Sequence, residues 1–467
     1  MKMITDKIPV VVQDIATLFR NNGFEINLVG GCVRDLLMGV DPHDWDMNTN
    51  ATPDEMITLC QKHHLRFSDV GLKHGTITIY IDHVGYEITT YRIDGNYSDG
   101  RHPDDVSFTK SLLEDLSRRD FTMNAIAMNP ITGRIYDPFG GENAIITKYL
   151  ESVGDAKNRI EEDALRMLRA LRFAIKYDLS IDSLLEDAIH SLASNINNVS
   201  KERITDEFRK IFETGKPVQN VFLQFSDFIS EIIPEIKPCI GFEQNNKYHK
   251  HNVYEHMLNV VDNCDPNKFE VKMAALLHDV GKPDAYTTDE DGHGHFYGHP
   301  VISAEISRKV LKNDFRLSNV ETERVLELVE FHDMTITPTV KAVRRALSNH
   351  GEDFMRDWFV LKQADMDDHI YPDKTNEKYP WTVQNLIPIM DDILEQDLAF
   401  SLKDLHINGD DIMTSFNVKP GKHIGTVLNE LLDLVISDTI ENETEELLST
   451  ARVLLQMLKV LPYESES

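Results

Sequence analysis

Residues 28–47, LVGGCVRDLLMGVDPHDWDM, combine side chains suited to handling a nucleoside triphosphate. Gly30 and Gly31 allow a turn in which the backbone approaches a phosphate closely. Arg34 offers a planar fork of donors to phosphate oxygens. Gly-Gly alone is usually only a turn, so the prediction depends on what accompanies it.

Two carboxylates follow in the same segment. Asp44 and Asp46 alternate with Trp45, so on a strand both carboxylates would point to one face. Paired carboxylates suit Mg²⁺ that also binds substrate phosphates. Glu87, in the later sequence GYEITTYR, could complete a three-acid site or act as general base on a 3′-hydroxyl.

The order GGCVRD followed by DWD resembles motif A of the class II tRNA nucleotidyltransferases and bacterial poly(A) polymerases. The resemblance implies a catalytic role, with Mg²⁺, for three carboxylates: Asp44, Asp46 and Glu87. It implies nucleotide binding by the turn and the helix that follows it: Gly30, Gly31, Arg34 and Asp35.

A second block, RRDFTMNA at residues 118–125, resembles motif B of the same family. The resemblance implies that Arg119 holds the triphosphate, that Asp120 orients it and that Asn124 contacts the nucleotide. An Arg-rich helix start with an Asp cap is the alternative. DPFGG at residues 137–141 resembles motif C, a glycine-rich connection between domains that move.

The block EEDALRMLRALRF spaces Asp163, Arg166, Arg169 and Arg172 by three residues. On a helix such neighbours touch, and three leucines would form a parallel apolar stripe. An Asp–Arg pair can read the Watson–Crick edge of a base without a template. The resemblance to motif D implies that Asp163 and Arg166 select CTP and then ATP, while the other two arginines support the nucleotide or hold the carboxylate.

The segment at residues 91–106 resembles the flexible loop that precedes motif B in this family. That loop is linked to the change from C to A addition. Its presence favours addition of C, C and A, or of A alone, over addition of C only.

A separate set of His and Asp residues occupies residues 240–370 and includes the string HDVGKP. The pattern resembles the HD phosphohydrolase superfamily and suits a water activated by a divalent metal of unknown identity. The candidate ligands are His256, His278, Asp279, His299, His332 and Asp365. Four further histidines, His249, His251, His293 and His295, are interpreted as surface residues.

The elements around these motifs indicate an α+β fold. Helices are expected at 8–22, 34–38 and 52–64, strands at 25–29 and 43–49, and a strand hairpin at 75–92. From about residue 145 the pattern is almost entirely helical. We expect a polymerase-β-like nucleotidyltransferase head (1–148), a helical neck (149–216), a helical body with the HD residues (217–375) and a helical tail (376–467), with residues 371–380 as a linker.

Composition limits the class of protein. The 467 residues allow several domains, and no apolar run is long enough to span a membrane. The four cysteines, Cys32, Cys60, Cys239 and Cys264, have no metal or disulfide spacing, so we expect a cytoplasmic protein. The net charge of −30 disfavours tight, non-specific coating of RNA.

These patterns predict template-independent addition of C, C and A to a tRNA 3′ end from CTP and ATP, with release of pyrophosphate. An enzyme that adds only A and a poly(A) polymerase are the alternatives. The tail holds 6 basic and 17 acidic residues, which disfavours a poly(A) polymerase because sequence-blind RNA binding needs positive charge. From another class, the chain could be an HD phosphohydrolase with a non-catalytic RNA-binding head.

Overall fold

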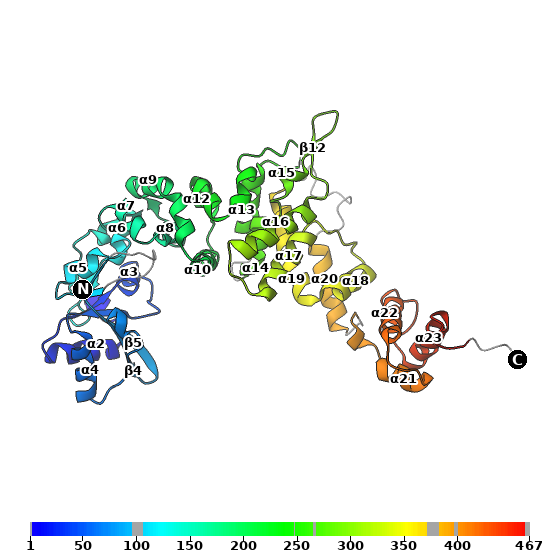
Figure 1. The fold of residues 1–467 in the computed structure, drawn as a ribbon, viewed down its shortest axis with the longest axis horizontal. Coiled ribbons are helices and arrows are strands. Elements are labelled where there is room, and N and C mark those ends of the chain that lie inside the picture. Colours follow the sequence, from blue (N-terminus) through cyan, green and yellow to red (C-terminus); the bar gives the residue numbers. More distant parts are fainter. Residues whose placement is uncertain are drawn as a thin grey trace. The chain divides into compact units, whose positions relative to one another are not determined.

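The computed structural model describes residues 2–95, 106–246, 248–264, 268–370, 383–396 and 400–462. The chain divides into two compact units, which are Met1–Lys237 with Lys309–Leu317, and Pro238–Arg308 with Ser318–Ser467 (Figure 1). A mixed sheet in the first unit and helices in both confirm the α+β prediction. The boundaries expected after residues 148 and 216 fall inside the first unit and stay predictions, and the one after 375 lies outside the described residues.

The N-terminal sheet has seven strands in the order β3-β4-β5-β2-β1-β8-β9. Strands β2 and β5 pair in parallel, and the other neighbours are antiparallel. The central pairing of β2 with β5 sets Met47 beside Ile88, so the segment before β2 emerges next to the strand that carries Glu87. The strands are β1 (Ile26–Val29), β2 (Met47–Thr49), β3 (Arg66–Ser68), β4 (Thr76–Ile81), β5 (Val84–Thr90), β8 (Ala127–Met128) and β9 (Ile135–Tyr136).

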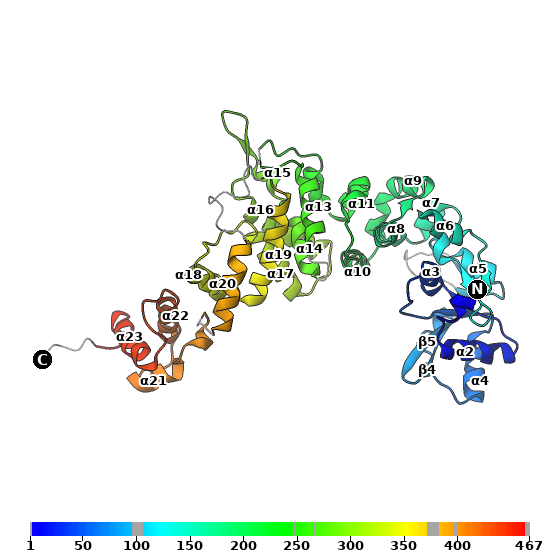
Figure 2. The same cartoon turned by 180° about the vertical axis from the view of Figure 1, so that it is seen from behind.

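Helices α2 (Val10–Asn21) and α4 (Pro53–Lys62) pack on this sheet, as the periodicity predicts (Figure 2). Apolar side chains of both helices, including Phe19 and Met56, are buried in one core with Ile77 and Ile88 of the strands. Thr52 caps α4 in a reciprocal capping box with Glu55, which is the Thr-Pro start read from the sequence.

Two expectations about motif A are wrong in detail. The second strand begins only at Met47, so Asp44 and Asp46 lie in the irregular segment before it. Proline and aspartate are poor strand residues, which explains the late start after Pro42. Helix α3 (Gly31–Leu37) begins at the second glycine, because Gly30 adopts φ 72° and ψ −130° at its N-cap.

The rest of the first unit is mainly helical. Its helices include α5 (Leu112–Ser117), α6 (Gly141–Thr147), α7 (Ala156–Glu162), α8 (Leu165–Tyr177), α9 (Ser183–Ser191), α10 (Lys201–Phe212), α11 (Gln219–Gln224) and α12 (Ser226–Ile232). Strands β6 (Arg92–Asp94) and β7 (Val106–Phe108) flank the expected flexible loop, of which residues 96–105 lie outside the described residues.

The chain returns to the first unit at residues 309–317. Phe315 is buried and packs edge to face on Phe208 of α10, with ring centroids 5.2 Å apart. The Arg316 backbone N–H donates to Thr205 Oγ1, and Asp314 pairs with Lys201. This short return segment therefore completes the packing around α10.

The second unit is helical except for a short pair of strands, β12 (Thr287–Thr288) and β13 (Gly294–His295), among its described residues. Its helices include α13 (Val253–Asn263), α14 (Phe269–Leu277), α15 (Lys282–Ala285), α16 (His299–Asn313, whose last residues belong to the return segment), α17 (Asn319–Phe331), α18 (Val340–His350), α19 (Glu352–Asp368), α20 (Val383–Glu395), α21 (Gly409–Phe416), α22 (Lys422–Ile436) and α23 (Thr444–Met457). The last three share one core. The expected linker at 371–380 lies outside the described residues, and within the described part each helix is too short or too polar to cross a lipid bilayer.

Candidate functional site

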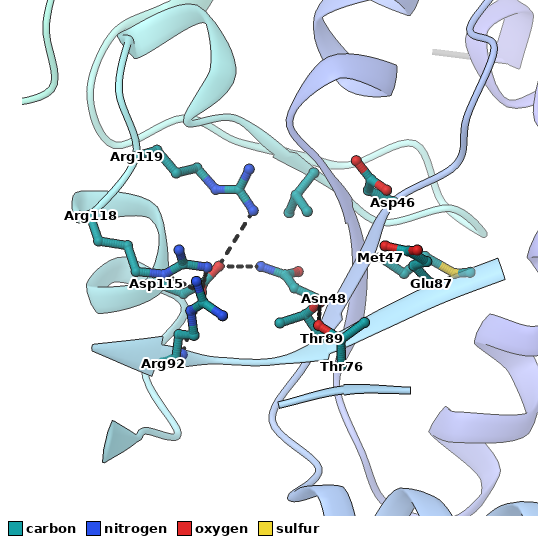
Figure 3. A pocket seen from close by; sticks show the side chains of 11 residues that line it. Asp46, Met47, Asn48, Thr76, Glu87, Thr89, Arg92, Asp115, Arg118 and Arg119 are labelled. Carbon is teal, nitrogen blue, oxygen red and sulfur yellow. Dashed lines mark hydrogen bonds and ion pairs between the residues drawn. The ribbon is translucent and has the colours of Figure 1, made fainter. Parts of the chain in front are cut away.

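A cleft of about 250 Å³ opens in the first unit beside β2 and β5. Asp46 and Glu87 lie on one side of it, and Arg92, Arg118 and Arg119 lie on the other (Figure 3). Acids on one wall and arginines on the other match the needs of a metal-bound triphosphate.

The carboxylates at this cleft influence one another. Burial raises the pKa of Asp46, and the neighbouring charges of Glu87 and Asp44 raise it further, while Arg119 opposes them. Three negative groups gathered in this way repel one another until a cation binds. Both Asp44 and Asp46 keep exposed surface, and of the two only Asp46 lines the cleft.

The arginine wall is anchored by Asp115 of α5, a residue that the sequence analysis did not identify. Its fully buried carboxylate pairs with Arg118 at 2.9 Å and with Arg119 at 3.7 Å, and it accepts a hydrogen bond from Asn48 at 2.8 Å. Burial raises the pKa of Asp115, but the two arginines outweigh it, so the pKa lies below its usual value. The block at 118–125 follows the end of α5, so its alternative as a helix start is wrong.

Motifs A and B meet through a network of hydrogen bonds. Arg34 donates to Asp35 at 2.8 Å and to Asn124 Oδ1 at 2.8 Å, and its guanidinium stacks over the ring of Tyr177 at 4.8 Å. A Cβ atom on Gly30 would stand 2.9 Å from Arg119 Nη1, so this glycine leaves room for the arginine. The block at 118–125 therefore lines the cleft through Arg118 and Arg119, and the turn follows Val29, which lines it too.

Asp120 joins the head to α8. Its Oδ2 receives Arg169 Nη2 at 2.6 Å, and its Oδ1 accepts from Asn124 at 3.0 Å and from the Phe121 backbone at 2.8 Å. Burial raises the pKa of Asp120, but Arg169 and these hydrogen bonds outweigh it and hold the pKa far below its usual value. Asp120 is therefore a permanently charged partner for Arg169.

Motif D is only partly arranged as expected. Arg166, Arg169 and Arg172 do follow one another along α8, with Leu165, Leu168 and Leu171 buried beside them. Asp163 does not lie in this row and does not bind Arg166. It ends α7 and binds Arg203 at 2.7 Å, while Arg166 binds Glu162 at 2.7 Å.

A local hydrogen bond of the Asp163 carboxylate keeps this residue outside α8. Its Oδ1 accepts from the Leu165 backbone N–H at 3.1 Å, as aspartate does at helix starts. Arg172 binds buried Glu207 at 2.6 Å, and Glu207 and Arg203 of α10 were both missed because no motif marks them.

In motif C, Asp137 accepts from the first two backbone N–H groups of α6, and a Cβ on Gly141 would stand 2.2 Å from the Thr122 carbonyl.

The second unit brings all six predicted HD residues together. They come from the body of α13, the end of α14, the start of α16, the end of α17 and the body of α19, in the order His256, His278 with Asp279, His299, His332 and Asp365. All six are buried. The six residues therefore lie together, and their role as metal ligands stays a prediction.

Asp279 lies at the centre of the cluster. Its Oδ2 is 3.3 Å from His256 Nε2 and 3.1 Å from His278 Nε2, and its Oδ1 is 3.1 Å from His299 Nε2. His332 Nε2 is 3.7 Å from the same Oδ1. One carboxylate thus faces two groups of imidazoles, His256 with His278 and His299 with His332, and each group with Asp279 has metal-binding spacing.

The imidazole rings are held in one orientation. The Nδ1 atoms of His278, His299 and His332 lie 2.7–2.8 Å from backbone carbonyls, and Nδ1 of His256 lies 2.8 Å from the Asp368 carboxylate. Such contacts fix the tautomer and leave Nε2 as the ligand atom, as in metal sites. Burial lowers the pKa of His256, but hydrogen bonds to three aspartates raise it to about 10.

Lys282 of the HDVGKP string completes the cluster. Its ammonium lies 2.6 Å from Asp279 Oδ2 and 2.8 Å from Gln244 Oε1, and it is buried. Burial raises the pKa of Asp279, but His278 and Lys282 outweigh it, so the pKa lies well below its usual value. One expectation is wrong here, because His249 is half-buried against His256 and His369 instead of lying on the surface.

Three family profiles match the chain. The "Poly A polymerase head domain" matches residues 26–151, the "Probable RNA and SrmB- binding site of polymerase A" matches residues 178–239, and tRNA nucleotidyltransferase domain 2 matches residues 301–451.

Curated relatives are named CCA-adding enzymes. That of Geobacillus sp. (strain WCH70) is 44% identical over 199 residues, which cover 43% of this chain and 48% of the relative. The chain thus spans about half the length of the first curated relatives that it matches. The CCA-adding enzyme of Lactobacillus helveticus (strain DPC 4571) is 29% identical over 456 residues, which cover 94% of this chain and 96% of the relative.

Solved structures share the fold. The Bacillus stearothermophilus CCA-adding enzyme in complex with CTP has a TM-score of 0.68, 25% identity and 96% coverage of both chains. The Thermotoga maritima CCA-adding enzyme complexed with tRNA has a TM-score of 0.62 at 17% identity, covers 98% of both chains and supports the fold alone. With a matching head, matching helical segments and a shared fold over nearly its full length, the chain is similar to the tRNA nucleotidyltransferases and poly(A) polymerases.

Proposed function

We propose that this protein adds C, C and A to the 3′ end of tRNA, taking CTP and ATP as substrates and releasing pyrophosphate. The observation that carries the proposal is the cleft in which Asp46 and Glu87 face Arg118 and Arg119. The names of the relatives and the CTP complex of a similar enzyme favour CCA addition over the alternatives.

The carboxylates would hold Mg²⁺. Their fit rests on the crowding of negative charge at Asp46, whose pKa is raised by burial and by the neighbours Glu87 and Asp44. When bound, Mg²⁺ would make the RNA 3′-hydroxyl more acidic and neutralise the triphosphate. Arg119, next to the Gly30 turn, would bind the phosphates, and Asp115 would keep it aimed at the cleft.

Base selection is assigned to Asp163 and Arg166, as the resemblance implies. Each already has a partner within the chain, since Asp163 binds Arg203 and Arg166 binds Glu162. A base edge must therefore compete with these ion pairs, or bind the atoms that they leave open. Arg169, locked to Asp120, ties this region to the cleft.

The tRNA partner and the compartment belong to the same proposal. Helices α21 to α23 carry an acidic balance, so we assign them a few positioned contacts with the tRNA body instead of a charged sheet. The four cysteines are buried and free, which is compatible with the cytoplasm.

The test is extension of a tRNA transcript that ends at its discriminator base, with Mg²⁺, CTP and ATP. A stop after three added nucleotides supports the proposal. A long ladder would identify a poly(A) polymerase, and extension only of a transcript ending in CC would identify an A-adding enzyme. Absence of extension would refute the transferase function.

A matched pair of variants assigns the chemistry to the cleft. Asp46→Asn removes a carboxylate at the cleft and should slow extension by ~100-fold or more, because it removes charge where the metal binds. Asp41→Asn removes an exposed carboxylate from the same segment, where it pairs with Lys7 at 3.2 Å. It should extend tRNA at the normal rate.

A second candidate activity rests on the buried His–Asp cluster. We propose that the six HD residues bind divalent metal and that this centre hydrolyses phosphoesters, with Asp279 shared between two metal positions. Four imidazoles with fixed orientation and two carboxylates are a nitrogen-rich donor set, which favours a transition metal over Mg²⁺.

This activity is separable by mutation. Asp279→Asn should abolish Mn²⁺- or Ni²⁺-dependent hydrolysis of bis(p-nitrophenyl) phosphate while leaving tRNA extension intact. Asp46→Asn should slow tRNA extension and leave this hydrolysis intact. Hydrolysis that survives in the Asp279→Asn variant would refute the assignment.

A further inference from the structure

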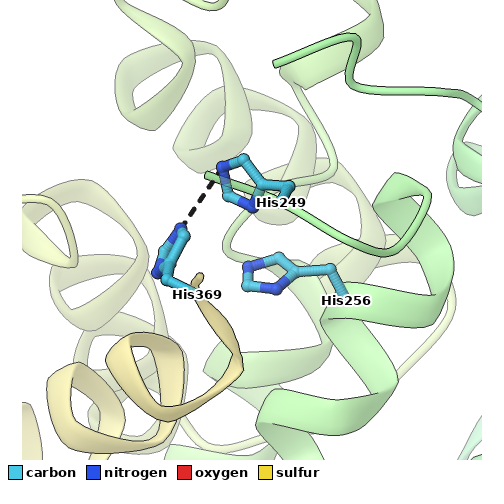
Figure 4. Close-up of side chains that lie close together, drawn as sticks. All are labelled: His249, His256 and His369. Carbon is cyan, nitrogen blue, oxygen red and sulfur yellow. Dashed lines mark hydrogen bonds between the residues drawn. The ribbon is translucent and has the colours of Figure 1, made fainter. Parts of the chain in front are cut away.

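An additional group of imidazoles adjoins the proposed HD centre. His249, His256 and His369 each bring one ring nitrogen within 4.8 Å of the other two. They come from the segment before α13, from α13 and from the residue that ends α19, and their rings face a common space (Figure 4). His249 and His369 are not among the HD residues.

The distance between two ring nitrogens of this group resembles the distance between two ligands of one metal ion. His249 Nε2 lies 3.2 Å from His369 Nε2. Two nitrogens bound to one tetrahedral metal at about 2.0–2.1 Å stand roughly 3.3 Å apart. The other ring nitrogen of His249, Nδ1, is buried without a hydrogen-bond partner. The pair thus has ligand spacing already.

His256 is engaged elsewhere. Its Nδ1 is held by Asp368 at 2.8 Å, and its Nε2 faces Asp279 and Asp365 at 3.3 and 3.2 Å. The carboxylate of Asp365 lies between the two groups, because its Oδ1 is also 3.6 Å from His369 Nδ1. That distance involves the other ring nitrogen of His369 and not the Nε2 that meets His249, so Asp365 stays a residue of the HD centre and lies beside the added pair.

We propose that His249 and His369, through their Nε2 atoms, bind one more first-row transition-metal ion beside the HD centre. Imidazole donors suit such ions better than they suit Mg²⁺ or Ca²⁺. Two imidazole ligands leave positions open, and waters or phosphate oxygens of a substrate would fill them. This inference rests on the proposed HD metal centre and adds a position to it.

The experiment counts metal ions. The metal-free full-length chain is equilibrated with Co²⁺, and bound cobalt per protein is measured by equilibrium dialysis. We expect His249→Gln/His369→Gln to bind one ion fewer than the parent chain. The control His63→Gln/His406→Gln removes two exposed histidines and should bind as many ions as the parent.

The outcomes separate the two proposals. Equal binding by the parent and His249→Gln/His369→Gln would overturn the added position and leave the HD centre standing. No binding by the parent would refute both. The single variant His249→Gln, which changes a residue outside the helices, guards against misfolding, and it should show the same loss with an unchanged melting temperature.

Discussion

Replacing Gly30 with alanine tests how the turn of motif A serves the cleft. Gly30 has φ 72° and ψ −130°, a conformation that residues with a Cβ avoid. The new methyl group would stand 2.9 Å from Arg119 Nη1. Because that atom is the far end of a flexible side chain, the guanidinium shifts more easily than the backbone.

The expected losses of stability and of activity follow from the backbone strain at residue 30 and from the displaced Arg119 guanidinium. The backbone strain costs about 1–3 kcal/mol of stability. If Arg119 loses one charge-assisted hydrogen bond to the triphosphate, the transition state loses about 1.5–3 kcal/mol. At 1.36 kcal/mol per factor of ten, kcat/KM for CTP should fall roughly 10- to 100-fold.

The assay compares Gly30→Ala with Gly39→Ala in tRNA extension and in thermal unfolding. Gly39 also has a positive φ of 77°, but a Cβ there would meet nothing within 4 Å. Both variants should melt earlier, and only Gly30→Ala should extend tRNA slowly. The reasoning is refuted if both variants lose the same activity, or if Gly30→Ala extends tRNA at the normal rate.

Three further predictions concern charges near the cleft. Glu87→Gln should move the acid limb of the pH profile of kcat/KM to lower pH, because Glu87 helps to raise the pKa of Asp46 and activity needs this carboxylate charged; an unmoved limb would contradict this. Asp115→Asn should cost about 3–5 kcal/mol of stability near neutral pH, since it breaks a buried ion-pair group. Because folding lowers the pKa of this carboxyl, its contribution is present above about pH 4 and is lost as the pH falls, so melting curves of variant and parent should converge in acid. Arg203→Ala removes the ion pair that positions Asp163 and should raise misincorporation of UTP or GTP about tenfold in single-turnover extension, and unchanged fidelity would count against base reading by this carboxylate.

Much of the candidate site in the first unit was predictable because short motifs carry it. The turn at Gly30, the arginine at 119 and the row of arginines along one face of α8 follow from local spacing and are found where expected. Local chemistry also explains the misplaced residues. Asp163 accepts the Leu165 backbone N–H from its position between α7 and α8, and Asp46 precedes a strand that Pro42 helps to delay.

The remaining site residues depend on contacts between distant parts of the chain. Asp115 was not singled out because nothing in its neighbourhood marks a buried anchor for two arginines. His249 was assigned to the surface, yet it meets His369, which is 120 residues away in sequence. Such pairs arise from the packing of α13 against α19, which periodicity does not specify.

The return of residues 309–317 to the first unit affects how the protein is made. A ribosome that has synthesised the first 237 residues has not yet made Phe315, so the aromatic face of Phe208 lacks its cover. Roughly 80 more residues must be translated, which takes about 4–16 s at about 5–20 residues per second. During that interval the nascent chain exposes an apolar surface, which makes it prone to aggregation. A fragment that ends at Lys237 would keep that apolar surface exposed permanently. Expression of the first unit by itself therefore requires residues 309–317 to be added back.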